Sequence, residues 1–136
     1  MRFKALLLTT LLASTQAMAI EFPQEVIESI DGTRVVAFIS QKDIDAAGTW
    51  EPLRTPPPVT FSQALESVAA ALAKRGVPTA SIRLASAELK EFPHQPGHWH
   101  YLIRLKKGTD RSFPRFFVVL TSGKVVAAIM EPEAYK

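Results

Sequence analysis

The sequence predicts an α+β protein in which a single amphipathic helix packs on an antiparallel sheet of four to five strands. Three observations lead to this prediction. One segment, 60–76, has the start signal, the apolar periodicity and the stop signal of a helix. Segments on both sides of it alternate apolar and polar residues with a period of two, as half-buried strands do. Short turns separate the later strands, which favours antiparallel pairing, and one helix can cover one face of such a sheet.

The first 19 residues have the composition of a secretory signal peptide. Arg2 and Lys4 precede an apolar run over 5–13, and Ala17 and Ala19 form an A-x-A cleavage site. The run is shorter than the roughly 18 apolar residues that span a bilayer, so an uncleaved membrane anchor is the weaker alternative. We expect cleavage after Ala19, and a mature protein that is periplasmic or fully secreted.

The mature chain, residues 20–136, suits one domain. We divide it into an N-terminal strand region with a proline connector, 20–58, and a helix followed by antiparallel strands, 59–132. Two of the 16 Lys and Arg residues lie in the signal segment, which leaves 14 against 13 acidic residues. A net charge near +1 favours neither nucleic acid nor an anionic membrane as a partner. The sequence has no cysteine, so we expect the core rather than disulfides to stabilise the domain.

The mature N-terminus is predicted to form a hairpin. Asp31-Gly32, a pair typical of a type I′ turn, separates 25–30 from the β-branched segment 33–39. The second arm has the composition of a strand, whereas the apolar spacing of the first arm also fits one helical turn. The residues at 41–45 could form a further turn of helix.

Proline dominates the connection that follows. Pro52 and the run 56–58 fix an extended path that cannot form a ladder of backbone hydrogen bonds. A proline run can bind the aromatic-lined groove of another protein, but we interpret this one as a rigid connector into the main helix.

The main helix is predicted to begin after Thr60 and to end at Gly76. Thr60 and Gln63 stand in the relation of a capping box, and Pro78 prevents continuation beyond Gly76. Apolar residues at helical spacing form a stripe that should face the sheet. They are Phe61, Ala64, Leu65, Val68, Ala69 and Leu72.

The rest of the chain is predicted to consist of strands joined by turns. These strands are 80–89, 98–106, 115–120 and 125–130. The alternation slips by one residue near Ala85-Ser86, which is typical of a β-bulge. Phe116 and Phe117 must point to opposite faces of their strand, so we expect one of them to be exposed unless another element covers it.

Several segments together resemble small exported PepSY-like domains. They are Trp50-Glu51-Pro52, the prolines before the helix, Trp99-His100-Tyr101 and the TSGKVV sequence at 121–126. The resemblance covers Trp50 to Pro132 and implies a helix before an antiparallel sheet, a non-catalytic binding or inhibitory role, and no site residues to transfer. The wider cystatin-like architecture has the same layout. However, Gln24-Glu25-Val26 lacks the glycine of the cystatin Q-x-V-x-G loop, which argues against protease inhibition.

All three histidines fall within seven residues, as His94, His98 and His100. On a strand His98 and His100 share one face, and the Pro-Gly pair before them could bring His94 back toward them. Three neutral imidazoles can bind Zn²⁺ or Cu²⁺, so metal binding is the alternative function. The interpretation that we prefer places His98 and His100 on a solvent face opposite Trp99, with no cofactor bound.

Four basic residues cluster around a predicted loop: Lys106, Lys107, Arg111 and Arg115. Asp110 is the only acidic residue among them. Such a cluster could bind an acidic partner and accelerate encounter. The interpretation that we favour is a solvated hairpin tip whose charges prevent edge pairing.

The sequence shows no recognisable catalytic motif. It has no G-x-S-x-G, no cysteine nucleophile and no glycine-rich phosphate loop. We therefore predict a non-enzymatic module that binds a protein or peptide in the periplasm, such as an inhibitor, an immunity protein or a PepSY-like regulatory protein. Metal binding is the second hypothesis, and an enzyme is a third that no named residue supports.

Overall fold

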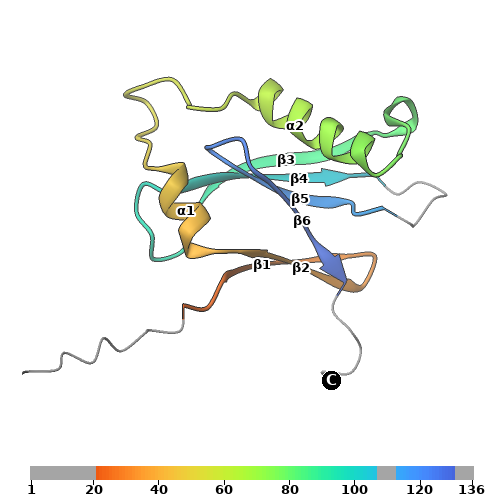
Figure 1. The fold of residues 1–136 in the computed structure, drawn as a ribbon, viewed down its shortest axis with the longest axis horizontal. Helices are drawn as coiled ribbons and strands as arrows, with labels where there is room; N and C mark the ends of the chain where they lie inside the picture. Colours follow the sequence, from red (N-terminus) through yellow and green to blue (C-terminus); the bar gives the residue numbers. More distant parts are fainter. Residues whose placement is uncertain (1–20, 107–112, 131–136) are drawn as a thin grey trace, which may run out of the picture.

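The computed structural model describes residues 21–106 and 113–130 and shows an α+β architecture (Figure 1). The predicted class is confirmed, but the described residues form two α-helices and two antiparallel sheets instead of one helix and one sheet. The elements are β1 (Gln24–Ile30), β2 (Thr33–Ile39), α1 (Gln41–Ala47), α2 (Phe61–Lys74), the 3₁₀ turn η1 (Thr79–Ser81), β3 (Leu84–Glu91), β4 (Trp99–Leu105), β5 (Phe116–Leu120), β6 (Val125–Ala127) and β7 (Ile129–Met130).

The two sheets share the last stretch of described chain. One sheet has the order β3-β4-β5-β6 and the other the order β1-β2-β7. The segment 125–130, predicted as one strand, leaves the first sheet at Ala128, whose N–H donates to the carbonyl of Phe116 at 2.9 Å. It then pairs with Val35 and Val36 of β2 in the second sheet. This crossing ties the N-terminal hairpin to the C-terminal strands.

The four-stranded sheet lies between α2 on one face and the three-stranded sheet on the other (Figure 1). Phe116 and Phe117 of β5 point to these opposite faces, and both are fully buried. We expected one of them to be exposed unless another element covers it, and the N-terminal hairpin provides this cover on the face opposite α2. The core between the sheets comprises Val35, Ala37, Ile39, Ile44, Phe92, Leu102, Phe116, Val118, Leu120 and Ala128. The core under α2 comprises Ala64, Val68, Leu72, Tyr101, Ile103, Leu105, Phe117 and Val119.

Several local signals in the sequence agree with the structure, but the predicted strand 80–89 begins only at Leu84, after η1, and Phe61 of the predicted stripe is exposed. Thr60 Oγ1 accepts from the Gln63 N–H at 3.2 Å, and Gln63 Oε1 accepts from the Thr60 N–H at 2.8 Å, so the capping box is confirmed. Asp31 and Gly32 have φ angles of 50° and 76°, and a type I′ turn requires both to be positive. The pairing register of β3 shifts between Leu84 and Ser86, where a bulge was predicted. The first hairpin arm is a strand rather than a helical turn.

The short helix α1 closes one end of the space between the sheets. Its Ile44 is buried in the core between the sheets, and Ser40 caps its start by accepting from the Asp43 N–H at 3.1 Å. Lys124, in the turn after β5, lies 2.7 Å from the Asp43 carboxylate. Thr121 Oγ1 donates to the carbonyl of Ala47 at 3.1 Å. The possible helical turn at 41–45 is thus a complete element with its own tertiary contacts.

A polar network links β1 of the three-stranded sheet to β3 and β4 of the four-stranded sheet. Arg104 of β4 forms an ion pair with Glu28 of β1, and its guanidinium also lies 3.8 Å from Glu88 and 3.2 Å from the hydroxyl of Ser86. The guanidinium carbon is 5.7 Å from the centroid of the Phe116 ring, within the range of a cation–π contact. These contacts fix the position of β1 over the four-stranded sheet.

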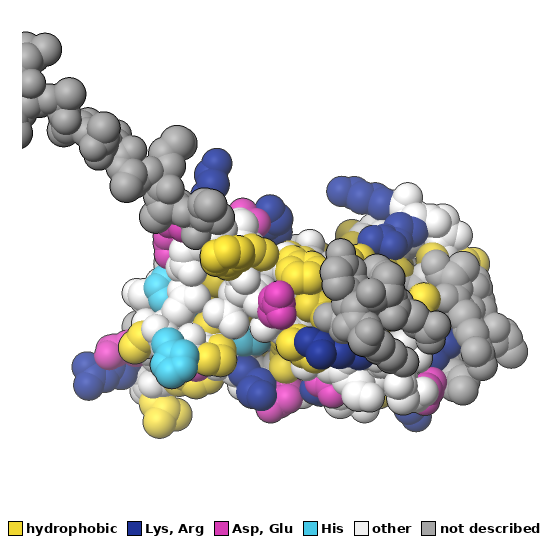
Figure 2. All heavy atoms as spheres, turned by 90° about the horizontal axis from the view of Figure 1, so that it is seen from below, with side chains coloured by type: hydrophobic (Ala, Val, Ile, Leu, Met, Phe, Trp, Pro, Cys, Tyr) yellow, Lys and Arg dark blue, Asp and Glu magenta, His cyan; other side chains and the backbone are white. Residues whose placement is uncertain are grey.

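Apolar side chains gather on the outer face of the three-stranded sheet (Figure 2). Ile27, Phe38 and Ile129 are exposed there, on three adjacent strands. Among the residues that the structure describes, no helix has the length and apolarity needed to cross a membrane.

The buried stripe of α2 can be tested by mutation. Leu72→Ala should lower the free energy of unfolding by about 2–5 kcal/mol, because the Leu72 side chain is fully buried between α2 and the sheet. Ser67→Ala, on the same helix but in neither core, should change it by no more than about 0.5 kcal/mol. Urea denaturation of the mature chain measures both. Equal losses at the two positions would show that the assigned stripe is wrong.

Candidate functional site

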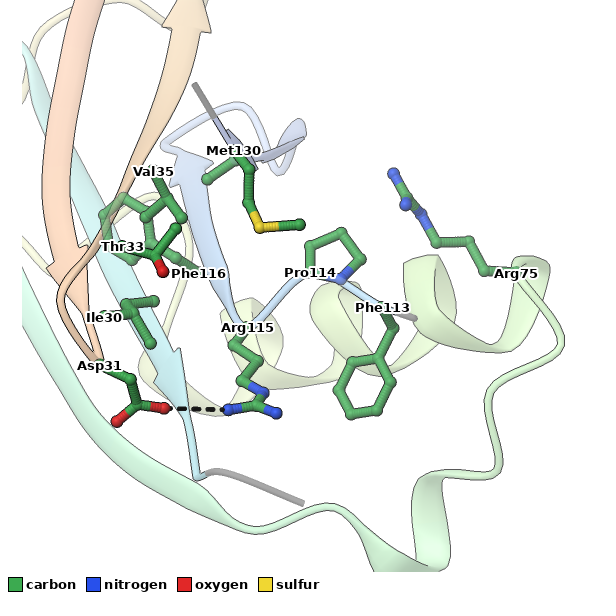
Figure 3. Close-up of a pocket in the computed structure, with 11 residues that line it drawn as sticks. Ile30, Asp31, Thr33, Val35, Arg75, Phe113, Pro114, Arg115, Phe116 and Met130 are labelled. Atoms are coloured by element: carbon green, nitrogen blue, oxygen red, sulfur yellow. Dashed lines mark hydrogen bonds and ion pairs between the residues drawn. The ribbon is translucent and has the colours of Figure 1, made fainter. Parts of the chain in front are cut away.

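A cleft of about 500 Å³ opens where the β1–β2 turn, the start of β5 and the end of α2 meet (Figure 3). Its apolar lining consists of Ile30, Val35, Phe113, Pro114, Phe116, Ala128 and Met130. Its polar lining consists of Asp31, Thr33, Arg75 and Arg115. Residues far apart in sequence therefore converge on one concave surface.

The strand register explains why these side chains face the cleft. Ile30 pairs with Thr33, and Val35 pairs with Met130, so all four lie on the inner face of the three-stranded sheet. Phe116 lies opposite them on the four-stranded sheet. Toward the hairpin turn the packed core between the sheets ends, and the space between the two layers becomes the cleft.

Two guanidinium groups and one carboxylate give the cleft its charge. The Arg115 side chain is only 10% exposed, and its Nη1 lies 3.5 Å from Oδ2 of Asp31 (Figure 3). Arg75 is the C-cap residue of α2 and is exposed. Within the described residues, no carboxylate lies within 4.0 Å of Arg75. Among the described lining residues, two cationic side chains and one anionic side chain thus border an apolar floor.

The structure divides the four predicted partner-binding residues. Arg115 lines the cleft. Lys106 is exposed just after β4, where its N–H donates to the carbonyl of Arg83 at 2.8 Å, and it is not among the lining residues. Lys107 and Arg111 lie outside the described residues. Arg115 therefore shares the cleft lining with Arg75, whereas Lys106 is not part of that lining.

The histidine prediction requires a correction at His100. Its side chain is only 3% exposed, and its ring stacks on Phe92 with 3.9 Å between ring centroids and an interplanar angle of 23°. We expected a solvent face, but the three-stranded sheet, α1 and Phe92 cover this side of β4. Burial, assisted by the nearby charge of Lys90, lowers the pKa of His100 from 6.5 to about 4. His100 is therefore neutral at neutral pH.

The other two histidines lie in different environments. His94 is exposed in the turn before β4, with a φ of 60°, whereas His98 is half-buried. The Nδ1 atoms of His98 and His100 are both buried without a hydrogen-bond partner. In the part of the chain that the structure describes, no group of three or more His, Cys, Asp or Glu side chains could hold a metal ion. A site built from all three histidines thus does not fit this conformation, and metal binding stays a prediction for solution measurements.

Sequence reasoning missed most of the cleft. Arg75 lay at the end of the predicted helix, Asp31 in the predicted turn and Met130 in a predicted strand, and nothing in the sequence joined them into one site. The signal that was available is the pair of arginines, Arg75 and Arg115, at the ends of two elements that must pack together. The sequence did not indicate which other residues line the cleft with these arginines, because several of them belong to the three-stranded sheet.

The burial of His100 predicts a specific pH dependence. Its folded pKa of about 4 lies below its unfolded value of 6.5, so the unfolded chain binds more protons between these values. The stability that His100 contributes should be complete above pH 6.5 and should decrease, by at most about 3 kcal/mol, as the pH falls toward 4.

Urea denaturation at several pH values tests this prediction. His100→Phe keeps an aromatic ring against Phe92 but cannot titrate, so its stability should fall less on acidification than that of the wild type. Parallel pH profiles for the two proteins would contradict the assignment.

Comparison with known proteins adds no family to this description. No protein-family model matches the chain, and no curated protein or solved structure shows significant similarity to it. The resemblance to PepSY-like domains therefore stays a prediction.

Proposed function

We propose that this protein is an exported, non-enzymatic module that binds another protein by seating an acidic, apolar peptide segment of that partner in the cleft. The observation that carries the proposal is the combination of Arg75 and Arg115 with an apolar floor. Export rests on the signal-like segment at the N-terminus. An inhibitor, an immunity protein or a PepSY-like regulatory protein would each use such a site.

The size of the cleft suits part of a peptide. Its volume of about 500 Å³ lies within the range of about 300–1,000 Å³ that is usual for binding pockets. Such a space accommodates a few side chains rather than a folded surface. The exposed Met130 and the half-buried Phe113 contribute contact area, and the flexible thioether of methionine adapts to different apolar shapes.

The charges favour a carboxylate on the ligand. Arg115 is largely buried and pairs with Asp31, so its side chain has little freedom left to lose on binding. Arg75 lies on the other side of Pro114 in Figure 3 and reaches over the cleft from the end of α2. A guanidinium can donate two parallel hydrogen bonds to a carboxylate. An acidic residue beside an apolar one would therefore satisfy both parts of the lining.

A pair of synthetic peptides can test the proposal. The probes are acetyl-Glu-Leu-Phe-Glu-amide and its neutral counterpart with Gln in place of both Glu residues. In NMR titrations of the mature protein, the acidic peptide should shift the amide signals of Ile30, Asp31 and Phe116. It should bind at least about ten-fold more tightly than the neutral peptide, because hydrogen bonds to charged groups contribute about 1.5–3 kcal/mol.

Two adjacent helix residues provide a matched control. Arg75→Glu should remove the preference for the acidic peptide, whereas Lys74→Glu makes the same change in charge at an exposed residue that does not line the cleft and should retain it. Both variants place a negative charge at the C-terminal end of α2, so both should lower the thermal midpoint by similar, small amounts. Equal affinity for the two peptides, or equal effects of the two substitutions, would contradict the proposed function.

A further inference from the structure

The loop that connects α1 to α2 carries an apolar side chain with no role in the fold. Leu53 is fully exposed at its tip. Its φ of 69° lies in the left-handed region, which residues other than glycine rarely adopt. The surrounding structure therefore holds a leucine outward in a backbone conformation that leucine itself disfavours. Backbone strain of this kind persists only where neighbouring contacts impose it, and it concentrates at functional sites.

The contacts that impose this conformation lie within the loop. Trp50 Nε1 donates across the turn to the carbonyl of Thr55 at 3.0 Å. The Arg54 N–H donates to the carbonyl of Glu51 at 3.4 Å, and their side chains form an ion pair at 3.5 Å. These contacts join the residues before Leu53 to those after it, so Leu53 projects from the tip of a closed turn.

The loop is also fixed to the body of the protein. The Trp50 N–H donates to the carbonyl of Gly97 at 2.9 Å, and the Trp50 ring meets Trp99 edge to face with 5.8 Å between centroids. Thr49 packs so closely on Gly97 that a Cβ atom there would lie 3.2 Å from the Thr49 Cβ. The prolines at 56–58 restrict the chain that leads on to α2. The loop is thus ordered before any partner binds.

We propose that this loop is a second contact surface, in which Leu53 inserts into an apolar pocket on a folded partner protein. A rigid loop binds with a smaller loss of conformational entropy than a flexible one. Glu51 and Arg54 flank the leucine with opposite charges, so the rim of the pocket should carry groups that complement a carboxylate and a guanidinium. A single leucine beside a carboxylate offers too little apolar area for stable binding to a membrane surface.

This surface is separate from the cleft. The loop lies at one end of the molecule, whereas the β1–β2 turn and the end of α2 lie at the other (Figure 1). Substitutions at Leu53 and at Arg75 can therefore be interpreted independently, and either proposal can fail without the other.

The test uses the mature protein as bait in the exported protein fraction of the organism that produces it. Wild type, Leu53→Asp and Ser62→Asp are compared. Ser62 is an exposed residue at the start of α2 and serves as the control for an added charge. A protein retained by the wild type and by Ser62→Asp, but at least ten-fold less by Leu53→Asp, is then purified and titrated against each bait. We expect the same ten-fold loss of affinity in the purified pair and no change with Arg75→Glu.

Two further variants separate binding from folding. Leu53→Gly removes the side chain and relieves the strained φ, so it should lose binding while its thermal midpoint stays equal or rises. Leu53→Met should keep both. The proposal is overturned if no retained protein depends on Leu53, if the purified pair binds Leu53→Asp as tightly as wild type, or if phosphatidylglycerol vesicles rather than a protein account for the retention.

Discussion

The structure depends on the burial of both faces of the four-stranded sheet. The strand β5 lies inside it, and its consecutive Phe116 and Phe117 fill the cores on opposite sides. Each large side chain removed from water stabilises the fold by roughly 1.5–3 kcal/mol, so neither face can be left open without a large loss. α2 covers one face, and the N-terminal hairpin covers the other. The Arg104–Glu28 ion pair and the shared strand segment β6–β7 hold the hairpin in place. The cleft is the end of this interface, where the two layers separate.

Much of the fold could be predicted because its signals are local. The capping box at Thr60, the turn at Asp31-Gly32 and the bulge near Ser86 each depend on residues adjacent in sequence. The second sheet could not be predicted in this way. Ala128 marks the point where one apolar segment changes partners, and nothing in its alternation distinguishes that from a continuous strand. The burial of His100 follows from the same non-local pairing.

The candidate site was only partly accessible from sequence for a related reason. Arg115 belonged to a visible cluster of basic residues, but the charged residues that share the cleft with it, Asp31 and Arg75, come from a hairpin turn and a helix end. Convergence of this kind depends on tertiary packing. Leu53 is a different case. The prolines at 56–58 indicated a rigid connection, but only the structure shows that Leu53 is exposed and has a φ in the left-handed region, which leucine disfavours.

We infer that the hairpin and the four-stranded sheet form one cooperative unit, since the cleft exists only while they are packed together. Native-state hydrogen exchange at increasing denaturant measures this most directly. We expect the hydrogen-bonded amides of β2 to exchange with the same free energy of opening as those of β5, equal to that of global unfolding. Opening of β2 at a distinctly lower free energy, with β5 still protected, would show that the hairpin detaches on its own and that the two layers are not one cooperative unit.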